Sequence, residues 1–162
     1  MNDRAVLLVF LLGLASSAAA LTDEEIEQYR AGAGMGYAKA AELNHFPGPM
    51  HVLELAAPLG LNAEQRAATE RLMQTHKAEA RAIGAKLVAA EQELERLFRS
   101  GQVRDADLAR VVAEASRLQG EYRLSHLETH RRMRGLLTAE QIKRYDELRG
   151  YGGGGQHPHR KH

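Results

Sequence analysis

The chain has 162 residues, with 22 lysines and arginines against 21 aspartates and glutamates, and it has no cysteine. A net charge near zero argues against bulk attraction to nucleic acid, and the lack of cysteine excludes a disulfide framework and a lipid-modified N-terminal cysteine. Aromatic residues make up only 5% of the chain, which leaves few large side chains for a globular core, while the abundance of Ala, Leu, Glu and Arg is typical of long helices.

Residues 1–20 have the pattern of a secretory signal peptide. A short polar start ends at Arg4, an apolar run follows over 5–14, and small residues at 18–20 form a cleavage site. We expect cleavage before Leu21, which places the mature protein in the periplasm without stable membrane insertion. An uncleaved anchor stays open, because the apolar run is at the lower limit for a membrane span.

The following segment divides into an arm and a short helix. Residues 21–48 are rich in Gly and Ala and weakly patterned, so we expect a partly ordered N-terminal arm. A short helix is predicted to begin at Pro49, because proline suits the first turn, and to end at Pro58 and Gly60. One helical domain is then expected over 49–149.

Two long amphipathic helices come next. From Ala63 to Phe98, apolar side chains recur at alternating steps of three and four residues, and a second such seam runs from Asp107 to Leu136. The short link RSGQVRDAD makes the two helices antiparallel neighbours. The sequence therefore predicts an all-α fold, a long antiparallel hairpin flanked by two short helices.

Two of the predicted helices begin with the same capping motif. LNAEQ at 61–65 and LTAEQ at 137–141 each place a cap residue three positions before a glutamine. In a capping box, the cap side chain accepts from the third backbone N–H of the helix, and the third side chain accepts from the cap's own N–H. The capping residues are Asn62, Gln65, Thr138 and Gln141. The second motif predicts a last short helix through Leu148.

The C-terminal stretch 150–162 contains four consecutive glycines and predicts a disordered tail. Its histidines are a secondary set of metal donors, which would chelate loosely or only add solubility. They are His157, His159 and His162.

The histidines of the helices predict a metal site. Matching the two apolar seams places His76 opposite His130 and within one turn of His126, so three imidazoles would meet at one level of the hairpin. His51 or Glu54 on the short helix would add a fourth donor. Imidazole is a ligand for Zn, Ni, Co and Cu. Because the neutral ring binds the ion, affinity should fall as the pH drops through ~6.5.

Other interpretations of these residues stay open. A histidine on an apolar helix face is more often a hydrogen-bonded core residue than a ligand. Arg131, Arg132 and Arg134 form a basic run that is usually a solvated face, and Leu124 and Leu127 lie off the apolar seam. Together they are a candidate surface for a client or partner. With no cysteine nucleophile, Gly-rich phosphate loop or HExxH motif, we expect no enzyme activity.

The two capped repeats in an exported helical hairpin resemble the Spy/CpxP-like periplasmic family, named for its LTxxQ motif. The resemblance covers residues 49–149, and Asn62 in place of the usual Thr is an equally good cap. It implies a cradle-shaped homodimer. His51, His126 and His130 resemble the metal-sensing branch, with its CnrX-type and ZraP-type relatives, and the Gly/His tail resembles that of the zinc-responsive relative.

Three functions follow from this resemblance. The first is a non-enzymatic stress protein that binds a divalent transition metal in metal sensing or tolerance. The second is an ATP-independent chaperone that holds unfolded periplasmic proteins on a concave helical surface. The third is a regulatory partner that docks on a membrane sensor of envelope stress.

Overall fold

The computed structural model describes residues 20–151, so the predicted signal peptide before residue 20 and the three tail histidines lie outside the described residues. This part of the chain contains six helices and no strand, which confirms the all-α fold class. No helix in it is both long enough and apolar enough to cross a membrane. The helices are α1 (Asp23–Ala31), α2 (Lys39–Glu42), α3 (Pro49–Glu54), α4 (Ala63–Arg99), α5 (Asp105–Arg134) and α6 (Ala139–Arg149).

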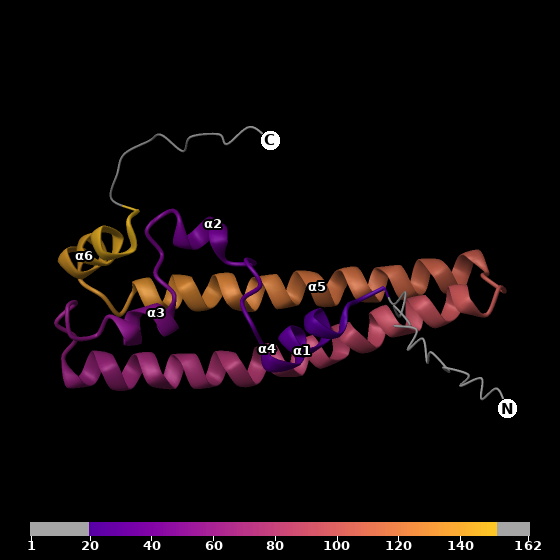
Figure 1. Ribbon diagram of the computed structural model, residues 1–162, viewed down its shortest axis with the longest axis horizontal. Coiled ribbons are helices and arrows are strands. Elements are labelled where there is room, and N and C mark those ends of the chain that lie inside the picture. Colours follow the sequence, from indigo (N-terminus) through magenta and orange to yellow (C-terminus); the bar gives the residue numbers. More distant parts are fainter. Residues whose placement is uncertain (1–19, 152–162) are drawn as a thin grey trace, which may run out of the picture.

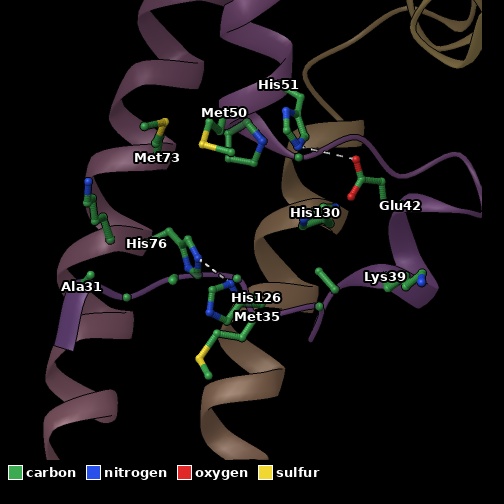
Figure 2. Close-up of a pocket in the computed structure, with 18 of the residues that line it drawn as sticks. Ala31, Met35, Lys39, Glu42, Met50, His51, Met73, His76, His126 and His130 are labelled. Atoms are coloured by element: carbon green, nitrogen blue, oxygen red, sulfur yellow. Dashed lines mark hydrogen bonds and ion pairs between the residues drawn. The ribbon is translucent and has the colours of Figure 1, made fainter. Parts of the chain in front are cut away.

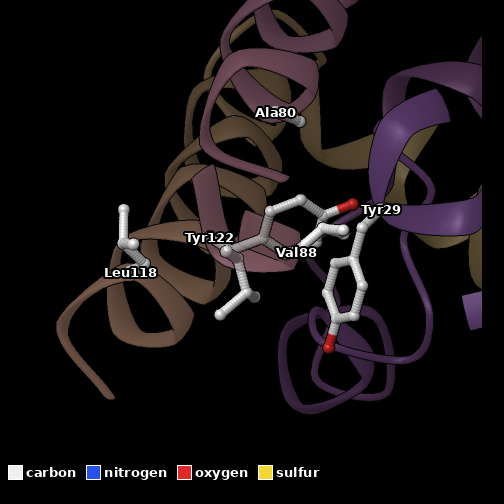
Figure 3. Close-up of a cluster of buried hydrophobic side chains, with 6 residues drawn as sticks. Tyr29, Ala80, Val88, Leu118 and Tyr122 are labelled. Atoms are coloured by element: carbon white, nitrogen blue, oxygen red, sulfur yellow. The ribbon is translucent and has the colours of Figure 1, made fainter. Parts of the chain in front are cut away.

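Helices α4 and α5 form the long antiparallel hairpin that the two apolar seams predict (Figure 1). Large buried side chains from both helices, including Leu87, Leu118 and Tyr122, pack in its middle (Figure 3). The register agrees with the matched seams, since these residues share one core and His76 contacts His126 nearer the open end. The hairpin prediction is therefore confirmed.

Residues 21–48 are more ordered than their weak pattern predicts. Helix α1 begins with a capping box of Thr22 and Glu25, and it packs along α4, where Tyr29 is only 7% exposed. At this contact α4 carries Gly84, and a Cβ atom there would lie 2.1 Å from the Tyr29 carbonyl oxygen. The arm is ordered by its contact with a glycine on another helix, which its own periodicity does not reveal.

Helices α3 and α6 lie at the open end of the hairpin (Figure 1). Helix α3 begins at Pro49, as predicted, and ends at Glu54, while α6 ends one residue beyond the predicted Leu148. These helices pack around a second core, formed by Val52, Leu59, Met133 and Tyr145. The two short helices thus close the end at which the capping motifs lie.

Both predicted capping boxes are present, with Asn62 and Gln65 at α4 and Thr138 and Gln141 at α6. The two glutamines also bond to each other, because the Nε2 of each donates to the Oε1 of the other, at 2.8 and 3.0 Å. Each Nε2 donates in addition to a backbone carbonyl of a neighbouring loop. Glutamate would cap a helix equally well but has no N–H to donate, so this pairing requires glutamine at both positions.

Candidate metal site

A cavity of ≈ 650 Å³ lies beside the hairpin, between its open end and the first core (Figure 2). Its walls come from α4, α5, α3, α2 and the loop after α1. All four of the histidines that the sequence marks as candidate ligands in the helices line it: His51, His76, His126 and His130. A cavity of this size is within the range of ligand sites in proteins.

His76 and His126 are in direct contact across the hairpin. The Nε2 atom of His76 lies 3.0 Å from the Nδ1 atom of His126, and the rings meet edge to face with centroids 4.4 Å apart. One ring donates the single proton between them. The other nitrogen of each ring, Nδ1 of His76 and Nε2 of His126, is buried and has no hydrogen-bond partner among residues 20–151. The pair is therefore only half satisfied.

Both imidazoles of this pair are held in the neutral form. Burial first, and then the neighbouring His76 and His130, lower the pKa of His126 to about 4. The pKa of His76 is also lowered, by burial and then by His130. The expectation that metal affinity falls through pH ~6.5 used the pKa of a free histidine. For this pair, protons should compete with the metal only at lower pH, because the protein interior disfavours the charged ring.

His130 lines the same cavity but bonds elsewhere. Its Nδ1–H donates to the carbonyl oxygen of Phe46 at 2.8 Å, which leaves Nε2 as the free acceptor. The ring lies against Gly48, where a Cβ atom would come within 3.1 Å of Nε2. Glycine at this position lets the imidazole reach the wall of the cavity.

His51, on α3, lies between two carboxylates. Its Nδ1 is 2.9 Å from Glu54 Oε2, and its Nε2 is 3.8 Å from Glu42 Oε1. The Glu54 side chain is 58% exposed and is not among the residues that line the cavity. The predicted fourth donor Glu54 thus contacts His51 from outside, whereas Glu42, which the sequence did not single out, reaches it from within.

The predicted meeting of three imidazoles is realised only for His76 and His126. In the part of the chain that the structure describes, no three His, Asp or Glu side chains are arranged to hold one ion. His130 is close enough to influence the pKa of both partners, but its ring is directed to Phe46. Matching the apolar seams predicted that His76 and His126 lie at the same level of the hairpin. The direction of the His130 ring depends instead on the loop that contains Phe46, which is distant in sequence.

Sequence reasoning missed one wall of the cavity, the loop over 31–38. The hydroxyl of Tyr122 donates to the Ala33 carbonyl at 2.6 Å, and this bond fixes the loop beside His126. Three methionines also line the cavity, and none was singled out: Met35, Met50 and Met73. The only sequence signal for this wall was a methionine among glycines in GAGMGYA. That stretch has neither helical nor strand periodicity, so it does not predict where the methionine lies.

The candidate partner surface is only partly free. Leu124 is 54% exposed and Leu127 is half-buried, while Arg131 and Arg132 are exposed. Arg134 instead lies over the Phe46 ring, 4.7 Å from its centroid, and donates to the carbonyl of residue 45. Arg134 therefore helps to fasten the loop that orients His130.

Comparison with known proteins gives one match. The model of a family described as LTXXQ motif family protein matches residues 49–149, which include the hairpin and both short helices at its open end. No curated protein and no solved structure matches the chain.

Proposed function

Since the chain belongs to the LTXXQ motif family, the family of the Spy/CpxP-like proteins, we propose that it is a periplasmic protein that binds a transition-metal ion between His76 and His126. The proposed role is metal sensing or tolerance, without enzyme activity, and the active unit is a homodimer. The metals that imidazole donors suit are Zn, Ni, Co and Cu. Family membership supports the fold and the compartment, and the cavity supports the ligand.

The observation that carries this proposal is the distance between the two ring nitrogens. Two imidazole nitrogens bound to one ion at about 2.0–2.1 Å lie about 3.0–3.4 Å apart. The 3.0 Å between His76 Nε2 and His126 Nδ1 meets this requirement. An ion would take the place of the shared proton, which would move to the other nitrogen of its own ring, after a tilt of the rings toward the cavity. Both rings are already neutral near pH 7, so binding would not need to displace a proton from a charged imidazole.

His130 is the third donor in this proposal. Metal-binding histidines usually donate their second N–H to a carbonyl or carboxylate, which sets the tautomer. The Nδ1–H of His130 makes such a bond to Phe46, so its Nε2 carries the free lone pair. Completion of the site requires this ring to swing across the cavity, and His51 is placed to add a fourth nitrogen from α3.

The test is a calorimetric titration of the full chain with Zn, Ni, Co and Cu(II) at neutral pH. We expect one tight site, retained when the tail histidines at 157, 159 and 162 are changed together to asparagine, and lost in His76→Asn, His126→Asn. Circular dichroism checks that the second variant keeps its helices. Equal affinity in both variants would place the metal elsewhere and end the proposal.

The exposed Leu124 supports a second candidate, the ATP-independent chaperone. A large apolar side chain about two helical turns before the exposed arginines Arg131 and Arg132 would suit an unfolded polypeptide that carries acidic groups. Leu124→Ser should then weaken the suppression of aggregation of an unfolding client and leave metal binding unchanged. His76→Asn, His126→Asn should have the opposite pair of effects if metal binding is the function.

A further inference from the structure

The methionines of this protein are concentrated at the cavity. The chain has five methionines, of which Met1 lies outside the described residues and Met133 is buried in the core at the open end. The other three all line the cavity: Met35, Met50 and Met73. The buried core in the middle of the hairpin contains no methionine, and of these three only Met35 packs against it, so the methionines gather at the cavity.

The three thioethers reach the cavity from different segments. Met50 comes from α3 and Met73 from α4, above the His76–His126 pair in the view of Figure 2, and Met35 comes from the loop after α1, below the pair. Met73 precedes His76 by three residues, so the two side chains are neighbours on one face of α4. The three methionines, from three segments of the chain, thus line the same cavity as the histidine pair.

Two of these methionines are unfavourably placed, one because its side chain is exposed and one because of its backbone conformation. Met50 is 51% exposed at the edge of the cavity. Met35 has a φ angle of 45°, in the left-handed region where a non-glycine residue is strained. Glycine would relax this turn, and it already stands on either side, at Gly34 and Gly36. Backbone strain of this kind is concentrated at functional sites, and the Met35 side chain also packs against the core in the middle of the hairpin.

The charges around the cavity favour an ion of low charge. Its lining includes Lys39 and Lys77 and a single carboxylate, Glu42. That carboxylate is already engaged, since its Oε1 accepts from Arg149 at 3.2 Å and from the Tyr151 hydroxyl at 3.1 Å. A divalent ion would bring two charges to a space with no free carboxylate, whereas a monovalent ion brings one.

We propose that the cavity selects monovalent copper, which the His76–His126 pair and the surrounding methionine thioethers hold together. This inference rests on the proposed use of the two histidines as ligands, and it names the ion they bind most tightly. Thioether sulfur is a soft, neutral donor, which suits a soft ion such as Cu(I). Because neither imidazole nor thioether carries a charge here, the ligand set matches a monovalent ion.

The test compares metals and methionine variants in the background without tail histidines. Anaerobic competition with a chromogenic Cu(I) chelator measures the Cu(I) affinity of the parent protein, of Met50→Leu, Met73→Leu, and of Met35→Leu. Leucine has nearly the volume of methionine and lacks the sulfur, so these changes disturb packing little. Met133→Leu is the matched control, because it removes a sulfur that lies outside the cavity.

We expect one Cu(I) per chain, bound more tightly than Zn, Ni or Co. The affinity for Cu(I) should fall by about tenfold or more in Met50→Leu, Met73→Leu. The loss of a residue that only hydrogen-bonds to a metal ligand already has an effect of this size, and in this proposal the two methionines are ligands themselves. Divalent affinity should not change in any methionine variant. X-ray absorption should detect copper–sulfur scattering that the double variant loses and Met133→Leu retains.

The unfavourable outcomes are distinct. If the protein binds divalent ions through His76 and His126, but Cu(I) affinity is independent of the methionines or no higher than that for Zn, the copper inference is wrong and the proposed function stands. If neither Cu(I) nor any divalent ion depends on the two histidines, both are wrong.

Discussion

Buried polar groups are treated in opposite ways at two levels of the same hairpin. At the open end, the amides of Gln65 and Gln141 use every donor and acceptor, on each other, on their own caps and on loop carbonyls. Between the open end and the core in the middle of the hairpin, His76 and His126 share one bond and leave two buried ring nitrogens without a partner in the described chain. A saturated network specifies the fold, whereas an unsaturated one costs stability and is retained where a ligand completes it.

The largest effect is expected from Gly84→Ala, which disturbs the contact between α1 and α4. The added Cβ would meet the carbonyl oxygen of Tyr29, a backbone atom that moves only if α1 does. We expect a loss near the upper end of about 1–3 kcal/mol in the free energy of unfolding. The arm should also become sensitive to proteolysis at 31–38.

Gly120→Ala is the matched control for this substitution. Gly120 is also inside a helix and exposed, and an added Cβ would meet no atom within 4 Å. It should stabilise the protein by about 0.5–1 kcal/mol through helix propensity alone. If the two substitutions change the midpoint of thermal unfolding equally, the packing of α1 on α4 does not require the absence of a Cβ atom at Gly84.

The saturated network should be broken by Gln141→Glu. The new side chain can still cap α6, but it loses the two N–H donors that serve Gln65 and the Leu59 carbonyl. An unsatisfied buried acceptor costs about 1–3 kcal/mol. Gln74→Glu, an exposed change on α4, should have almost no effect on the midpoint of urea unfolding. If both variants shift the midpoint of urea unfolding equally, the bonds between the two glutamines contribute nothing to stability beyond helix capping.

The unsaturated pair should make the metal-free protein sensitive to acid. The folded pKa of His126 is about 4 and that of His76 is also lowered, while in the unfolded chain histidine titrates near ~6.5. Between these values the unfolded state binds more protons, so stability is full above pH ~6.5 and is lost as the pH falls toward about 4. Unfolding midpoints in chelator from pH 7 to 4 test this direction; a flat profile would contradict the burial of the pair.

The smallest effect on stability is expected from replacing the pair with leucines. In His76→Leu, His126→Leu, two half-satisfied polar rings become apolar side chains, and replacement of both partners is nearly neutral or stabilising. The metal-free variant should unfold within about 1 kcal/mol of the parent at pH 7, lose the acid sensitivity and bind no metal. A large loss of stability would show that the pair is structural, like the glutamines.

The fold and part of the site follow from local signals. Periodic apolar residues predicted both long helices and their antiparallel arrangement, and the matched seams brought His76 close to His126. The same reasoning could not direct His130, because the Phe46 carbonyl that orients it lies 84 positions away in sequence. Nor could it predict the lowered pKa of His126, which depends on burial rather than on neighbours in the chain.

The sequence by itself determined the hairpin, its register and its capped helix starts, because periodicity and capping act within one or two turns of a helix. Only the tertiary structure decided that residues 31–38 close a cavity and that Met35, Met50 and Met73 line it together with the histidines. The placement of residues 31–38 depends on the close approach of α1 to Gly84 and on the hydrogen bond from Tyr122 to Ala33. Both contacts join segments that no sequence periodicity connects. Long-range packing assembles such a site, so its members become visible only when the chain is folded.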